Sequence, residues 1–119
     1  MKYLVVLLLS TLFLVSCGDR EDPVVRFITP PNNTLVSPGE SVSFQVEVTD
    51  NEALASITVG GDVTGLPTIN EFDAMDKHNF LFNVTINTGS PVGQEITVTI
   101  TATDQDGNQG SEDLLLVVN

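Results

Sequence analysis

The chain has 119 residues, of which 41% are hydrophobic and none is tryptophan, so it has room for one small domain and no second core. Sixteen acidic side chains against four basic ones give a net charge of −12, and such a surface repels nucleic acid. Because the same charge also keeps a domain soluble, it does not by itself indicate a cation site.

Residues 1–16 have the layout of a secretory signal peptide. Lys2 precedes an uncharged, mostly apolar stretch of 14 residues from Tyr3 to Ser16. A helix that stays in a bilayer needs about 20 apolar residues, so we expect cleavage. Removal of residues 1–16 leaves three basic side chains against 16 acidic ones, a net charge of −13.

The four residues Leu14-Val15-Ser16-Cys17 resemble the bacterial lipobox, in which an aliphatic, a variable and a small residue precede a cysteine. The resemblance implies that the Cys17 thiol takes a diacylglyceryl group and that Cys17 becomes the mature N-terminus. It also accounts for a lone cysteine in a secreted chain, although an ordinary signal peptide could carry one there by chance. Two or three acyl chains would anchor the protein on a membrane almost permanently.

Residues 17–23 are expected to form a lipidated cysteine and a short acidic tether. In Gram-negative lipoproteins an aspartate directly after the cysteine tends to mark inner-membrane retention, and this chain has Gly18 there. The resemblance therefore favours the outer membrane. The acidic run 19–22 is similar to short signals that send some lipoproteins to the cell surface, and the side that the domain faces stays open.

Alternating apolar and polar residues predict three strands in the rest of the chain. The inward-facing residues are Val42, Phe44, Val46 and Val48 in the first strand, Phe80, Phe82, Val84 and Ile86 in the second, and Ile96, Val98, Ile100 and Ala102 in the third. Weaker runs predict flanking strands over 24–29, 54–59 and 114–118, with a poorly defined piece between 63 and 72. No stretch after residue 16 has the period of a helix.

Turn-forming residues separate these runs, at 30–33, 37–39, 60–62, 88–91 and 106–108. About seven short strands in roughly 100 residues predict an all-β domain over 24–119, an immunoglobulin-like antiparallel β-sandwich. The Cys–Trp–Cys core of antibody domains is missing, so the domain is expected to fold without a disulfide.

Two segments, 30–44 and 96–110, resemble the bacterial Ig-like and cadherin-like modules of surface lipoproteins and adhesins. The first is Pro-Pro-Asn-Asn-Thr-Leu-Val-Ser-Pro-Gly-Glu-Ser-Val-Ser-Phe, and the second is Ile-Thr-Val-Thr-Ile-Thr-Ala-Thr-Asp-Gln-Asp-Gly-Asn-Gln-Gly. The second segment is similar to the closing hairpin of those modules. The resemblance implies an architecture and a location, and it implies no reaction.

An antiparallel up-and-down order of the strands would distribute the loops between two ends of the domain. The tether, 50–52, 73–76 and 104–110 are expected at one end, with most of the acidic residues. The turns at 32–33, 60–61 and 89–90 and the C-terminal Asn119 are expected at the other end, which should be nearly neutral. A tether over 18–23 reaches at most about 20 Å, so the acidic end should lie near the membrane.

The acidic end allows two interpretations. Asp50, Asp104, Asp106 and Asn108 could supply several of the six to eight oxygens that Ca²⁺ takes. However, the full motifs of cadherin-like modules are missing, and the run 104–108 lacks the ligand spacing of an EF-hand. A plain hairpin turn with Gly107 or Asn108 at positive φ explains the same residues, and we favour it.

His78 is the only histidine, with Asp73, Asp76 and Lys77 close to it in sequence. One histidine without a second ligand or a positioned nucleophile indicates a polar residue at a strand entrance rather than a catalytic base. We therefore expect no enzyme and no cofactor, and interpret the chain as a membrane-anchored binding or structural module with a protein or glycan partner. The alternative is an ion-binding sensor or a small metal-dependent enzyme that uses Asp104, Asp106 and His78.

Overall fold

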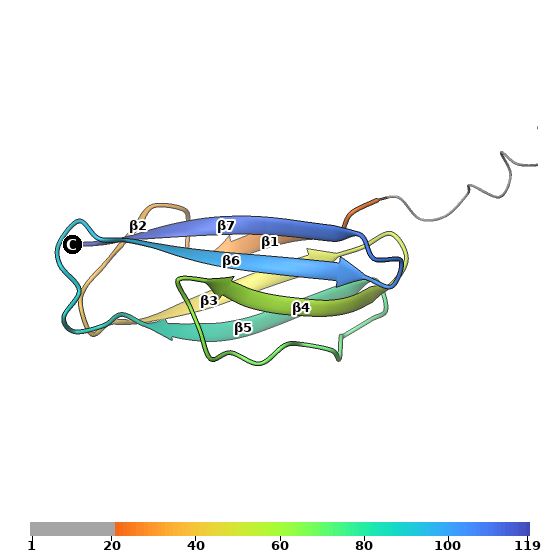
Figure 1. Ribbon diagram of the computed structural model, residues 1–119, viewed down its shortest axis with the longest axis horizontal. Helices are drawn as coiled ribbons and strands as arrows, with labels where there is room; N and C mark the ends of the chain where they lie inside the picture. The colour runs from red at the N-terminus through yellow and green to blue at the C-terminus, as the bar shows by residue number, and fades with distance from the viewer. Residues whose placement is uncertain (1–20) are drawn as a thin grey trace, which may run out of the picture.

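The computed structural model describes residues 21–119, which form seven strands and no helix (Figure 1). The predicted signal peptide, Cys17 and the first part of the predicted tether lie outside the described residues. The strands are β1 (Val24–Thr29), β2 (Thr34–Val36), β3 (Ser41–Thr49), β4 (Leu54–Gly61), β5 (Lys77–Thr85), β6 (Glu95–Asp104) and β7 (Gln109–Val118). The expected all-β sandwich is confirmed.

Two sheets pack face to face. One has the order β1-β3-β5 and is antiparallel throughout, and the other has the order β2-β7-β6-β4. In the second sheet β2 runs parallel to β7, while the β7-β6 and β6-β4 pairs are antiparallel. The sandwich is therefore mixed at one edge, where the sequence predicted only antiparallel pairing.

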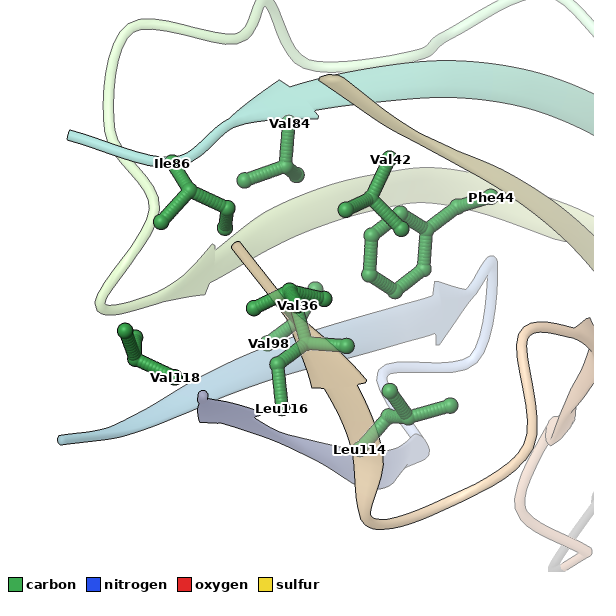
Figure 2. Packing of buried hydrophobic residues seen from close by; sticks show 9 residues of the cluster. All are labelled: Val36, Val42, Phe44, Val84, Ile86, Val98, Leu114, Leu116 and Val118. Carbon is green, nitrogen blue, oxygen red and sulfur yellow. The ribbon is translucent and has the colours of Figure 1, made fainter. Parts of the chain in front are cut away.

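The core lies between the sheets and is built by the predicted alternation. In β3 the side chains of Val42, Phe44, Val46 and Val48 are all buried, and the polar residues between them face outward or lie half-buried. Nine buried residues form the cluster of Figure 2: Val36, Val42, Phe44, Val84, Ile86, Val98, Leu114, Leu116 and Val118. A second cluster comprises Val25, Val46, Val48, Leu54, Ile57, Ile100 and Ala102. The burial of such side chains is the main stabilising term of the fold.

Three predicted elements differ from the observed ones. The strand expected over 114–118 begins at Gln109, because the hairpin after β6 is tight and Gln109 already pairs with Thr103. The piece expected between 63 and 72 is no strand, and its only ladder contact is a bridge between Ile69 and Ile57. The short strand β2 was not predicted, because the three residues between the turns at 30–33 and 37–39 are too few to show a period.

The loops are distributed between two ends as predicted. At the end that we call the proximal pole, the backbone N–H of Gln105 donates to Ala53 O at 2.9 Å and that of Leu54 donates to Met75 O at 2.7 Å. A Cβ on Gly110 would collide with Pro23 O, so the chain enters the domain at this pole. The proximal pole thus comprises residues 21–23, 50–53, 73–76 and 105–108.

At the opposite end, the distal pole, Gly93 N donates to Val118 O at 2.7 Å and Asn119 N donates to Val36 O at 2.8 Å. This pole comprises residues 30–33, 37–40, 62–66, 87–94 and 119, and Figure 1 shows the C-terminus there. The expectation of a nearly neutral distal pole is wrong, because Glu40 and Asp62 lie there and accept hydrogen bonds from the N–H groups of Ser37 and Thr97.

Candidate functional site

The hairpin between β6 and β7 is organised around the carboxylate of Asp104. This residue is 2% exposed. Its Oδ1 accepts from the backbone N–H groups of Asp106 at 3.0 Å and Asn108 at 2.8 Å, and its Oδ2 accepts from Asn108 Nδ2 at 2.9 Å. Gly107 has φ +88°, which supplies the positive φ predicted for a hairpin turn. Asp104 therefore closes the turn from inside.

Asp50 has a similar local role in the loop between β3 and β4. Its Oδ2 accepts from the backbone N–H groups of Glu52 at 3.2 Å and Ala53 at 3.0 Å. This is the side-chain-to-backbone pattern by which aspartate forms turns. The loop is joined to the other loops of the proximal pole, because Asp50 N donates to Asp76 O at 2.9 Å.

The structure brings the loops of Asp50, Asp104, Asp106 and Asn108 to one pole, as the sequence predicted. The oxygens of Asp104 already bind N–H groups of its own turn, and a calcium ion would have to compete with these donors. Within residues 21–119, no group of three or more His, Cys, Asp or Glu side chains is arranged to hold a metal ion. Asp104, Asp106 and His78 therefore do not form the single site that the metal-enzyme alternative requires. Calcium binding stays a prediction.

His78 lies near the start of β5 and is held by the 73–77 turn. Its Nδ1 accepts a hydrogen bond from Asp73 N at 3.1 Å and lies 3.5 Å from Asp73 Oδ2. The ring stacks on Phe80 with centroids 5.6 Å apart and meets Phe72 edge-on at the same distance. These contacts agree with a polar residue at a strand entrance.

The rings of β5 continue as an aromatic row that the sequence interpretation did not identify. Phe80 packs on Phe82 at 5.9 Å, and Phe82 stacks on Phe44 at 4.8 Å with an angle of 8° between the ring planes. Phe80 and Phe82 are only half-buried, and they line a hollow together with Leu66, Pro67 and Ile69 of the segment after β4. The i, i+2 spacing of 78, 80 and 82 is the sequence signal for such a row.

A hollow at the distal pole lies between the segment after β4 and the loop before β6. Amide and hydroxyl side chains line much of it, among them Thr64, Asn83, Asn87, Ser90 and Gln94, with Leu66 and Ile96 as apolar walls. The carboxylate of Asp62 also lines the hollow, and its Oδ2 accepts from Thr97 N–H at 2.8 Å. The other polar lining groups are uncharged hydrogen-bond donors and acceptors, which suits a polar ligand. A second hollow at the proximal pole is lined by Ala53, Phe72, Met75 and Gln105.

No protein-family model matches the sequence, and no curated protein is a detectable relative. Among solved structures, the fold is similar to fibronectin(III)-like modules of CbhA from Clostridium thermocellum, with a TM-score of 0.56 and 14% identity over 80% of this chain and 94% of that chain. The similarity shows the fold alone: an immunoglobulin-like β-sandwich similar to that of fibronectin(III)-like modules.

Two other similarities are too low to support an inference. The twitchin kinase region from C. elegans matches with a TM-score of 0.49 and 22% identity, over 80% of this chain and 16% of that chain. A Niemann-Pick type C2 protein from the Japanese carpenter ant matches with a TM-score of 0.45 and 8% identity, over 87% of this chain and 96% of that chain.

The part of the chain that the structure describes contains no helix long and apolar enough to cross a membrane.

Proposed function

We propose that the chain is a membrane-anchored lipoprotein whose fibronectin III-like domain is a non-enzymatic binding or structural module. The lipobox-like sequence that ends at Cys17 supports the anchor. The similarity to fibronectin(III)-like modules supports the module. The outer membrane is the proposed location, because the residue after the cysteine is Gly18 and not the aspartate that tends to mark inner-membrane retention.

One observation carries the proposal: the chain enters the domain at one pole, and the amide-lined hollow lies at the other. Pro23 packs against Gly110 at the proximal pole, whereas Gln94 and Ser90 line the hollow at the distal pole. A lipid on Cys17 and a tether of about 20 Å would hold the proximal pole near the bilayer. The distal hollow would then face away from the membrane and be open to a protein or glycan.

The anchor is tested by Cys17→Ala. The substitution removes the proposed site of lipid attachment, so the variant should lose incorporation of labelled fatty acid and leave the membrane fraction or stay unprocessed. Ser16 and Gly18 are retained, so signal-peptide recognition is changed as little as possible. Unchanged labelling of the variant would end the lipoprotein proposal.

The binding role of the distal hollow is tested on a glycan array with two matched glutamine variants. Gln94→Ala removes an amide from the distal hollow, and Gln105→Ala removes one from the hollow at the proximal pole. A single lost hydrogen bond of this kind weakens binding by about 1 kcal/mol, roughly fivefold. Equal loss with both variants, or loss only with Gln105→Ala, would exclude the distal hollow as the glycan site.

A further inference from the structure

The two sheets leave four edges, and three of them are protected against pairing with another strand. The edge strand β2 has only three residues. The edge of β4 is covered by the segment after it, since Ile57 and Ile69 exchange hydrogen bonds at 3.0 and 2.8 Å. The edge strand β1 is broken by an irregularity between Phe27 and Thr29. Short, covered and bulged edges are the usual means of preventing edge-to-edge association.

The fourth edge belongs to β5, which is long and regular. All nine residues from Lys77 to Thr85 pair with β3 without a break. Ile86 N donates to Glu40 O and Ile86 O accepts from Gly39 N, so even-numbered residues point their backbone groups toward β3. By the alternation of a strand, Asn79, Leu81 and Asn83 point theirs away from β3.

The outward edge of β5 carries little that would block a partner. Among the described residues, one hydrogen bond reaches the outward-pointing backbone groups of residues 79–83: Asn79 N–H donates to Asp73 Oδ2 at 2.9 Å. The sequence from 78 to 94 contains no charged residue, in a chain of net charge −12. The Leu81 side chain is 75% exposed at the centre of the strand. Such an edge is a template for another strand.

The sequence of this edge is a palindrome, Asn79-Phe80-Leu81-Phe82-Asn83. We propose that β5 pairs antiparallel with β5 of a second copy of this chain, about a twofold axis at Leu81. In this register Leu81 lies opposite Leu81 of the second copy, each Phe80 lies opposite a Phe82, and each Asn79 lies opposite an Asn83. A twofold interface must be self-complementary, and a palindromic strand meets that requirement residue by residue.

The backbone groups fit the same register. The two Leu81 residues form a hydrogen-bonded pair and exchange two N–H···O bonds. Each Asn83 N–H donates to Asn79 O of the other copy, and Asn83 O takes the place of Asp73 Oδ2 as the acceptor of Asn79 N–H. The three-stranded sheet becomes a continuous sheet through both copies.

Apolar surface beside the edge adds to the pairing. An apolar pocket adjoins the outward edge, lined by Val59, Leu66, Pro67, Ile69, Phe80, Leu81 and Phe82. Pairing places half-buried Phe80 beside Phe82 of the second copy, so the two aromatic rows meet on the inner face. Aromatic cross-strand pairs are among the stabilising pairs of antiparallel sheets.

Cysteine cross-linking of the full chain, purified in a non-ionic detergent, tests the register. Leu81→Cys places two thiols across the axis, at a Cα separation of about 5.5 Å that a disulfide can bridge. Val92→Cys is the control, because Val92 is 77% exposed but lies at the distal pole. Mild oxidation should link Leu81→Cys on the order of a thousandfold faster, since pairing raises the local thiol concentration from micromolar to millimolar.

Position 83 checks the register independently. In this register position 83 lies opposite position 79 of the second copy, so the two cysteines of Asn83→Cys are four residues apart along the strands. Their Cα atoms are then separated by about 13 Å along the strands, which no disulfide spans. It should therefore cross-link as slowly as Val92→Cys, and the unmodified chain shows the background from Cys17. Linking of Leu81→Cys no faster than Val92→Cys would overturn the proposal, and equal linking of positions 81 and 83 would overturn the register.

A charge exchange gives a second readout that needs no cysteine. Leu81→Lys and Leu81→Glu each place like charges across the axis, so each variant alone should sediment as a monomer. Because position 81 faces only itself, a mixture of the two should recover the dimer as a heterodimer. The side chain is mostly exposed, so melting temperatures should stay close to that of the unmodified chain. A monomeric unmodified chain, or a mixture that does not pair, contradicts the proposal.

Discussion

Asp104→Ala should destabilise the domain more than any other acidic-to-alanine change in the same hairpin. The substitution leaves three donors without their acceptor: the backbone N–H groups of Asp106 and Asn108, and Asn108 Nδ2. Hydrogen bonds to a charged group contribute about 1.5–3 kcal/mol each, and water can replace part of this in a turn. We expect a loss of about 2–4 kcal/mol in the free energy of unfolding, which lowers the melting temperature by roughly 10–25 °C.

The assay is urea and thermal unfolding of residues 21–119 followed by circular dichroism. Asp104→Asn keeps one acceptor oxygen but places an amide against Asn108 Nδ2, so it should cost about 1–2 kcal/mol. Asp106→Ala changes the exposed acid two residues along and should stay within about 0.5 kcal/mol. If Asp104→Ala costs no more than Asp106→Ala, the carboxylate does not close the turn, and the account of the hairpin is wrong.

Gly61→Ala should lower the free energy of unfolding by about 1–3 kcal/mol, because φ at this residue is +79° and the new Cβ would lie 2.5 Å from Thr97 O. At the neighbouring Gly60 a Cβ would have no atom within 4 Å, so Gly60→Ala should change the free energy of unfolding by under about 0.5 kcal/mol. Equal thermal melts for the two variants would contradict this. If the proximal pole binds Ca²⁺, the affinity should be in the weak range of about 10⁻⁴–10⁻³ M, and calcium at ten times Kd should stabilise the domain by about 1.4 kcal/mol. Asp106→Asn should abolish that shift, and a shift no larger than that of magnesium would leave only charge screening.

The strands that face the core on one side could be predicted, because burial of one face imposes a period of two on the sequence. The same constraint is missing in the segment from Gly61 to Lys77. That segment forms two isolated β-bridges, Ile69 with Ile57 of β4 and Ala74 with Lys77 at the start of β5. Because it is not a strand with one buried face, its apolar residues need not alternate. The strand β2 has only three residues and pairs with the C-terminal half of β7, 82 residues away in sequence. Such pairing is set by tertiary contacts that no local pattern contains.

The acidic hairpin shows which part of a site local sequence can predict. Asp104 continues the inward-facing series Val98, Ile100 and Ala102, so the period alone places it inside. The turn after it was predicted correctly, and of the two residues proposed for the positive φ, Gly107 and Asn108, it is Gly107 that has it. The sequence did not indicate that the carboxylate would be used by its own turn, because that depends on the geometry of Asn108. The palindrome in β5 was also readable, but its meaning depends on β5 being an edge.

The two proposals together predict how the pair would sit on membranes. The strand β5 runs from the proximal to the distal pole, so antiparallel pairing places the proximal poles of two copies at opposite ends. Nine residues of strand span about 30 Å, which exceeds the tether of about 20 Å. If the strands are perpendicular to the bilayer, the two lipid anchors cannot reach the same membrane and must insert into two opposed membranes.

Vesicles that carry the lipidated chain should therefore cluster, and those that carry Leu81→Lys should stay dispersed at equal protein density. Light scattering measures the difference, and Val92→Lys controls for the added charge at an equally exposed site. If vesicles that carry Leu81→Lys cluster as well as those that carry the unmodified chain, the pairing of β5 does not cause the clustering. Dimers in detergent without clustering of vesicles would mean that the domain lies with its strands along the membrane, because both tethers can then reach the same bilayer.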